Sequence, residues 1–187
     1  MKEFSLSRNF LRENEAKNLS FQMFRAHELG ESYVDEQCPK SDSFYNLSIF
    51  EGLKEKVRTF IEKNTNTNLA STFTYARIYR KGEILKKHVD REACEYSATI
   101  TLDYSGEQPW NFFIKDNKQI LLEINRGDIL IYKGINLPHW RDELEDEWQT
   151  QVFLHYAPCK KEDIKDSEKL NKVFLDLYKK SEMKDQT

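Results

Sequence analysis

The sequence predicts a mainly β protein with flanking helices, in which an antiparallel sandwich or barrel lies between helical N-terminal and C-terminal segments. Short stretches rich in strand-forming residues follow one another from residue 71 to residue 158, with turn residues between them and no helical pattern. On both sides of this region the apolar residues recur at helical spacing. We expect one domain over residues 1–187, with 1–70 as helical support, 71–158 as the β core and 159–187 as a C-terminal helix and tail.

Three helices are expected outside the β core. The first spans 11–29, where apolar residues keep a loosely helical spacing, and the proline and serines of 33–45 then indicate a loop. Ser48 and Glu51 form a capping-box pattern that predicts the start of the second helix. The polar run 64–68 ends that helix. A short C-terminal amphipathic helix is indicated by Leu170, Val173, Phe174, Leu177 and Tyr178.

The strands of the core are predicted by alternation and by β-forming residues. Residues 73–79 alternate with period two, and residues 96–104 are rich in β-formers. Turns are expected where Gly82, Asp116 and Gly127 interrupt these runs. Further strands are expected at 110–114, 120–124, 128–132 and 149–156.

The composition argues against several classes of protein. With 29 basic and 32 acidic residues the net charge is −3, which provides neither a basic field for nucleic acid nor a polybasic membrane patch. Three widely spaced cysteines argue against a disulfide framework. No signal peptide is visible, and no stretch approaches the roughly 18 apolar residues that cross a bilayer. We therefore expect a cytoplasmic protein that binds neither nucleic acid nor membrane. The oligomeric state is left open.

The residues best suited to chemistry are His88 and Asp90. Side chains two apart on an extended chain point to the same side, so this imidazole and carboxylate can bind one ion from a single strand end. His139 is the natural third ligand, since the intervening chain is long enough for several strands to fold back. An HxD pair alone occurs often by chance. Two histidines and one carboxylate, however, form the facial triad of non-haem Fe(II) oxygenases, which leaves positions open for a chelating co-substrate and dioxygen.

Three blocks of the sequence resemble Fe(II)/2-oxoglutarate-dependent dioxygenases of the prolyl 4-hydroxylase-like group. They are 79–90, with its tyrosine, glycine turn and HxD, the strand 97–104, and the strand 126–132 that leads to the distal histidine. The resemblance covers about half the chain, 73–156. It implies a double-stranded β-helix (jelly-roll, cupin-like) core, Fe(II) as metal, 2-oxoglutarate as co-substrate, and ascorbate as a candidate reductant. It also implies hydroxylation of an unactivated C–H bond in a peptide, protein or small molecule.

The sequence departs from this group at the residue that binds the distal carboxylate of 2-oxoglutarate. The group usually places an arginine or lysine about ten residues after the second histidine, and here that position is Gln149. Glutamine carries no charge, so it cannot form a bidentate ion pair. If the chain is extended after His139, Arg141 faces the same side and becomes the expected cation, with Gln149 and Gln151 as neutral helpers. As a surface residue, Arg141 would instead pair with a neighbouring carboxylate.

Four further side chains are secondary candidates for the pocket. Arg77 and Arg80 are weaker candidates for the same anion. Tyr79 matches a position of the group where a phenol hydrogen-bonds the co-substrate, but it also suits ordinary barrel packing. His155 shares strand parity with the two glutamines and could reach the pocket, although a satisfied barrel residue is the more common outcome.

Two other functions fit the same residues. A cupin-like barrel with two histidines and a carboxylate could be a non-oxidative metal-binding module or a metal-dependent isomerase, which the uncharged Gln149 favours. Alternatively, the chain could be a structural protein whose charged terminal helices bind a partner.

Overall fold

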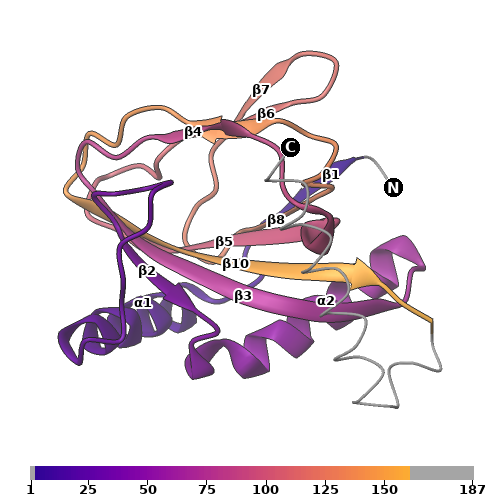
Figure 1. The fold of residues 1–187 in the computed structure, drawn as a ribbon, viewed down its shortest axis with the longest axis horizontal. Helices are drawn as coiled ribbons and strands as arrows, with labels where there is room; N and C mark the ends of the chain where they lie inside the picture. Colours follow the sequence, from indigo (N-terminus) through magenta and orange to yellow (C-terminus); the bar gives the residue numbers. More distant parts are fainter. Residues whose placement is uncertain (1–2, 161–187) are drawn as a thin grey trace.

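Two antiparallel sheets face each other, and two helices cover the outer face of the larger sheet (Figure 1). The structure is a computed structural model and describes residues 3–160. The six-stranded sheet has the order β1-β8-β5-β10-β3-β2, and the four-stranded sheet has the order β4-β9-β6-β7. The strands of the larger sheet are β1 (Phe4–Ser7), β8 (Ile129–Tyr132), β5 (Tyr96–Tyr104), β10 (Trp148–Pro158), β3 (Leu69–Arg80) and β2 (Asp42–Tyr45). Those of the smaller sheet are β4 (Leu85–His88), β9 (His139–Arg141), β6 (Phe112–Lys115) and β7 (Gln119–Leu122).

The main hydrophobic core lies between the larger sheet and the helices α1 (Glu13–Glu28) and α2 (Glu51–Thr65). Every second residue of the central strands points into this core, including Ile78 of β3, Ile100 of β5 and Leu154 of β10. Because the helices bury this face, the opposite face of the same strands is free to carry polar side chains toward the smaller sheet. The polar residues of that face are Arg77, Ser97, Thr99, Thr101, Gln149, Gln151 and His155, all buried.

The predicted β core is confirmed, and the structure gives the bounds of its strands. Strand β5 has the bounds that the sequence predicts, and β3 and β10 extend the predicted strands at both ends. Gly82 has a positive φ of 77°, which suits the turn expected between β3 and β4. The predicted C-terminal helix lies outside the described residues. Within them, neither helix is long and apolar enough to cross a membrane.

The prediction for the N-terminal segment needs two corrections. The N-terminal segment contains two strands besides its helices, and β2 lies inside the stretch 33–45 that was expected to be a loop. Both strands have four residues and form by pairing along edges of the larger sheet, β1 with β8 and β2 with β3. Such short segments owe their conformation to their partner and carry little pattern of their own. The capping box is wrong as well, because Ser48 begins a 3₁₀ turn, η1 (Ser48–Phe50), and α2 begins only at Glu51.

Candidate metal centre

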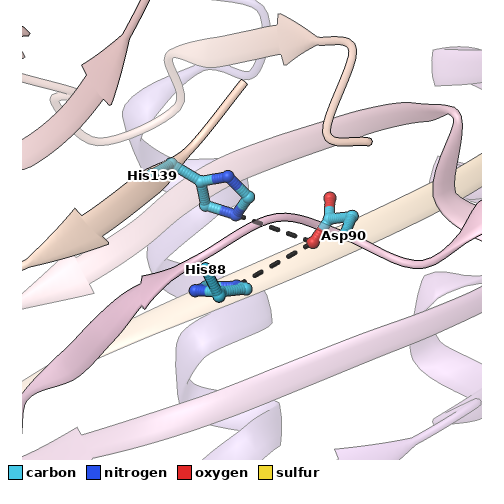
Figure 2. Close-up of side chains that lie close together, drawn as sticks. All are labelled: His88, Asp90 and His139. Carbon is cyan, nitrogen blue, oxygen red and sulfur yellow. Dashed lines mark ion pairs between the residues drawn. The ribbon is translucent and has the colours of Figure 1, made fainter. Parts of the chain in front are cut away.

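The pairing of two short strands brings the predicted metal ligands together. In the antiparallel pair of β4 and β9, His88 lies directly opposite His139. Asp90 follows just beyond the end of β4, so its carboxylate turns toward both imidazoles (Figure 2). Its Oδ1 lies 3.9 Å from Nε2 of His88 and 3.6 Å from Nε2 of His139. One ligand atom from each residue falls within 4.8 Å of the others, which is close enough to hold one ion.

Both histidines present the same nitrogen to this point. Nδ1 of His88 is 2.7 Å from the carbonyl oxygen of Lys86, and Nδ1 of His139 is 2.9 Å from that of Leu137. A carbonyl oxygen only accepts hydrogen bonds, so Nδ1 carries the ring proton in each case and donates it. The lone pair is therefore on Nε2, the atom directed at Asp90, and the tautomer is the one that a metal ligand needs.

Burial keeps the second histidine in its neutral form. His139 is almost fully buried, and this burial lowers its pKa, against the opposing effect of the nearby Asp90 carboxylate. A neutral imidazole can donate its lone pair to a cation, whereas a protonated one cannot. His139 therefore offers a neutral nitrogen donor beside Nε2 of His88 and the carboxylate of Asp90.

The second oxygen of Asp90 is enclosed by other residues. The Ser97 hydroxyl donates a hydrogen bond to Oδ2 across 2.6 Å, and Nδ1 of His155 lies 3.0 Å from the same hydroxyl. Burial lowers the pKa of His155 to about 4, so its ring is neutral near pH 7. On another side, Gly134 comes so close that a Cβ atom there would lie 1.9 Å from Oδ2. His155 thus contacts the ligand set through Ser97, as part of the barrel interior.

A cavity of about 700 Å³ opens in front of the three ligands. Its inner wall includes His139, Tyr79 and Tyr132, and its outer part includes the exposed Tyr33 and Tyr45. The other lining residues from β3, β10 and the loop before β2 are Asp35, Glu36, Gln37, Phe73, Tyr75, Arg77, Phe153 and His155. A space of this size is typical of a small-molecule site and would also accept one side chain of a larger substrate.

Arg141 is buried without a counterion. It lies on β9 on the same face as His139, as the parity of an extended segment predicts. One nitrogen, Nη1, donates to the backbone oxygen of Trp110, while Nε and Nη2 have no hydrogen-bond partner among the described residues. Burial lowers the pKa of Arg141 to about 10. The alternative of a surface arginine paired with a neighbouring carboxylate is therefore wrong for this residue.

Gln149 and Gln151 lie near this guanidinium and bond to each other. Gln149 Nε2 donates to Gln151 Oε1 at 3.0 Å, and its own Oε1 accepts from the backbone nitrogen of Trp110 at 2.8 Å. Trp110 thereby connects Gln149 with Arg141. The ring of Tyr79 packs edge-on against Trp110, with centroids 5.0 Å apart. Arg141, Gln149 and Gln151 are thus connected with Tyr79 in one buried region around Trp110. Of these four predicted co-substrate residues, Tyr79 lines the cavity and the other three do not.

The other two arginines already have anionic partners. Arg77 lines the cavity, but its Nη2 lies 2.7 Å from Oδ2 of Asp35 and it also donates to Gln37. Arg80 is on the opposite face of β3, where Nη2 is 2.6 Å from Asp42. Among the three candidates, Arg141 alone lacks a carboxylate partner within the described residues.

The sequence analysis missed several residues of the site, of which Ser97 had a visible signal. In β5 the polar Ser97, Thr99 and Thr101 alternate with apolar residues, which marks a second, polar face of a strand that is buried on both sides. Gly134 and Asp35 had no such signal, because each belongs to the site only through a contact with a distant part of the chain.

Comparison with solved structures identifies the fold. No protein-family model matches this sequence, and neither does any curated protein. The chain is similar to a prolyl hydroxylase from Trichoplax adhaerens in complex with a peptide fragment of the hypoxia inducible factor oxygen degradation domain, with a TM-score of 0.70, 13% identity and 84% of each chain covered. It is similar to HygX from Streptomyces hygroscopicus with nickel and 2-oxoglutarate bound, with a TM-score of 0.64, 14% identity and 83% of each chain covered.

A third similar structure is SnoN, a non-haem alpha-ketoglutarate-dependent epimerase from nogalamycin biosynthesis. Its TM-score is 0.66 at 12% identity, with 83% of this chain and 76% of that chain covered. The core is therefore the double-stranded β-helix that the sequence resemblance implied, with helices on one side. At identities this low the likeness concerns the fold.

Proposed function

We propose that this chain is an Fe(II)- and 2-oxoglutarate-dependent oxygenase that hydroxylates an unactivated C–H bond. His88, Asp90 and His139 would hold the iron, and Arg141 would bind the distal carboxylate of 2-oxoglutarate. The observation that carries the proposal is Arg141, a fully buried guanidinium on the same strand face as a metal-ligand histidine, with two nitrogens that have no partner in the part of the chain that the structure describes.

The donor set suits ferrous iron. Two imidazole nitrogens and one carboxylate oxygen are the ligands of the non-haem facial triad, and their side chains converge from one side. Such a set leaves room for a co-substrate that binds through two oxygen atoms. Two of the three similar proteins support this assignment, since one is described with 2-oxoglutarate bound and the other as alpha-ketoglutarate dependent.

The buried cation favours an anionic co-substrate over a neutral one. Taking an unpaired charge out of water costs several kcal/mol unless a partner compensates it. Among residues 3–160, Nε and Nη2 of Arg141 have no hydrogen-bond partner, which suits a carboxylate accepting two hydrogen bonds. The guanidinium carbon lies 5.0 Å from the ring centroid of Trp110 and 5.2 Å from that of Phe112. These two rings pack against Tyr79 and Tyr132, which line the cavity.

The residues around the cavity would bind the co-substrate at one end and cover the outer opening with apolar rings. Bound iron and 2-oxoglutarate would activate dioxygen as the oxidant, with one oxygen atom going to succinate as carbon dioxide leaves and the other to the substrate carbon. Arg141 would fix one end of the co-substrate, with Tyr79, Gln149 and Gln151 supplying neutral hydrogen bonds. The substrate would enter past Tyr33 and Tyr45, whose rings cover the outer part of the cavity with apolar surface.

The substrate is proposed as a peptide, protein or small molecule. A cavity of about 700 Å³ is compatible with each of them. Of the similar proteins, one is complexed with a peptide and another belongs to the biosynthesis of a small molecule. Succinate release from 2-oxoglutarate, measured against amino acids, peptides and cell extract, would identify the class. The mass of the product would separate hydroxylation from epimerisation.

One experiment tests the co-substrate site directly. The protein is mixed anaerobically with Fe(II) and 2-oxoglutarate, and the visible metal-to-ligand charge-transfer band of the chelate is titrated. Arg141→Gln should raise the Kd for 2-oxoglutarate about 30-fold, since losing hydrogen bonds to a charged group costs about 2 kcal/mol. Arg80→Gln is the matched control, because Arg80 pairs with Asp42 on the other face of β3. A wild-type protein without the band would favour the non-oxidative metal-binding module.

A further inference from the structure

We infer that Ser97, His155 and Gly134 form a positioning group that holds Asp90 as a ligand through one oxygen atom. The inference rests on the proposed function and names residues that the sequence motif does not contain. Asp90 Oδ1 is the oxygen that faces the two histidines, and Oδ2 is the oxygen that faces Ser97 and Gly134.

The hydroxyl of Ser97 has one hydrogen and three neighbours. It lies 2.6 Å from Asp90 Oδ2, 3.2 Å from the backbone oxygen of Cys94 and 3.0 Å from Nδ1 of His155. The contact with the carboxylate is the shortest and is charge-assisted, so the hydrogen points there. The contact with Cys94 is longer and has a neutral acceptor.

His155 fixes the direction of that hydrogen. A neutral imidazole carries one ring proton, and its Nδ1 can be either donor or acceptor. If Nδ1 accepted, Ser97 would give up its only hydrogen and two oxygens would face each other at 2.6 Å without a proton between them. Nδ1 therefore donates to the Ser97 oxygen, and the Ser97 hydrogen remains for Asp90. Phe73 packs against the ring of His155, with centroids 4.6 Å apart, and keeps it in place.

Gly134 closes the remaining side of the carboxylate. Its carbonyl accepts from the backbone nitrogen of Asp90 at 2.9 Å, which brings the two backbones together. A Cβ at this position would lie 1.9 Å from Oδ2 and 2.6 Å from Cγ of Asp90. The φ of Gly134 is not positive, so the requirement for glycine here is space for the carboxylate and not backbone freedom.

Holding Oδ2 in this way has a consequence for the metal. A carboxylate that bound through both oxygens would use one more coordination position, and the site must leave three for the co-substrate and dioxygen. A hydrogen bond to the second oxygen keeps it away from the ion. Ser97 would thus preserve the room for 2-oxoglutarate, acting through Asp90 without touching the metal.

The test measures metal binding rather than turnover. Mn(II), which binds the same ligands without oxidation, is titrated calorimetrically into the full-length chain. Ser97→Ala should raise the Kd for Mn(II) about 10–100-fold, the usual effect of losing a hydrogen bond to a metal ligand. Ser97→Thr retains the hydroxyl and should restore the wild-type Kd within about threefold. His155→Phe keeps a ring but removes the donor, and should raise the Kd less than Ser97→Ala does, because the Ser97 hydroxyl can still donate to Asp90.

Ser20→Ala is the matched control. Ser20 is also a buried serine, but its hydroxyl bonds to Thr150 on the helix side of the larger sheet. It should lower thermal stability as Ser97→Ala does while leaving Mn(II) binding unchanged. A wild-type Kd in Ser97→Ala, or an equal loss in Ser20→Ala, would overturn the positioning role. Absence of Mn(II) binding in the wild-type protein would instead overturn the proposed function.

Discussion

The two faces of the six-stranded sheet are built from the same strands, but one face forms the hydrophobic core and the other carries buried polar residues. In β5, Ala98 and Ile100 point to the helices and join the main hydrophobic core. Ser97 and Thr99 point to the opposite face, where they form hydrogen bonds with Asp90 and Gln151. Neighbouring residues on one strand therefore belong to different environments. The comparison teaches that alternation allows a buried strand to contribute stability on one face and a polar site on the other.

Removing a metal ligand should have the largest effect: metal binding on the cavity face should be lost while the core on the helix face stays intact. Asp90→Ala takes away the carboxylate common to both short contacts with the histidines, so metal binding and iron-dependent turnover should be lost. The fold should persist, because the main core lies on the other face. Calorimetry with Mn(II) and circular dichroism would measure the two effects. Turnover at the wild-type rate would refute the ligand assignment.

A second large effect is expected from filling the space beside Asp90. Gly134→Ala puts a methyl group where Oδ2 now lies, so the carboxylate must move and the Kd for Mn(II) should rise at least about 100-fold. Gly52→Ala is the control, since a Cβ there meets nothing within 4 Å and Gly52 lies within α2. That change should leave Mn(II) binding as it is and stabilise the helix by about 0.5–1 kcal/mol.

The opposite result is expected on the helix face. Ile100→Ala deletes fully buried side-chain atoms of the main core and should lower the free energy of unfolding by about 2–5 kcal/mol. Under conditions where the variant remains folded, its Kd for Mn(II) should match that of the wild type. Denaturant unfolding and calorimetry on the same sample would compare them. A parallel loss of metal binding would mean that the two faces are not independent.

The smallest effect concerns pH. Burial lowers the pKa of His155 to about 4 in the folded protein, below its ordinary value of 6.5. Because its pKa is lower in the folded state, His155 binds a proton more readily in the unfolded chain. Its contribution to the free energy of unfolding is therefore fully present above pH 6.5 and is lost as the pH falls toward 4. Between pH 7 and pH 5 the loss should be roughly 2 kcal/mol. Unfolding of the metal-free wild type and of His155→Phe at both pH values would isolate it, since the variant should lack this part of the dependence.

Sequence reasoning succeeded where the information is local. The bounds of β5 follow from its β-forming residues, and the common orientation of His139 and Arg141 follows from strand parity. The convergence of His88, Asp90 and His139 was expected from the HxD spacing together with the family resemblance. These features depend on periodicity or on an ordered set of motifs, both of which are visible in one dimension.

The parts that could not be predicted depend on contacts between distant segments. The strands β1 and β2 form by pairing with β8 and β3. That Nε and Nη2 of Arg141 have no hydrogen-bond partner within residues 3–160 is likewise a property of the tertiary structure. Ser48 illustrates a local signal that misled, because a 3₁₀ turn precedes α2 and the capping geometry does not form. Local patterns compete with tertiary packing, and packing decides at such short elements.

Within the described residues, strand β4 has only β9 as a neighbour in its sheet, and their register shifts between Leu85 and His88. Few backbone hydrogen bonds therefore hold this margin of the barrel. An ion bound by His88, Asp90 and His139 would cross-link β4 and β9 at the point where the two histidines face each other. Amide protons of β4 should accordingly exchange more slowly once metal is bound, because local unfolding of β4 would then require the metal–ligand bonds to break.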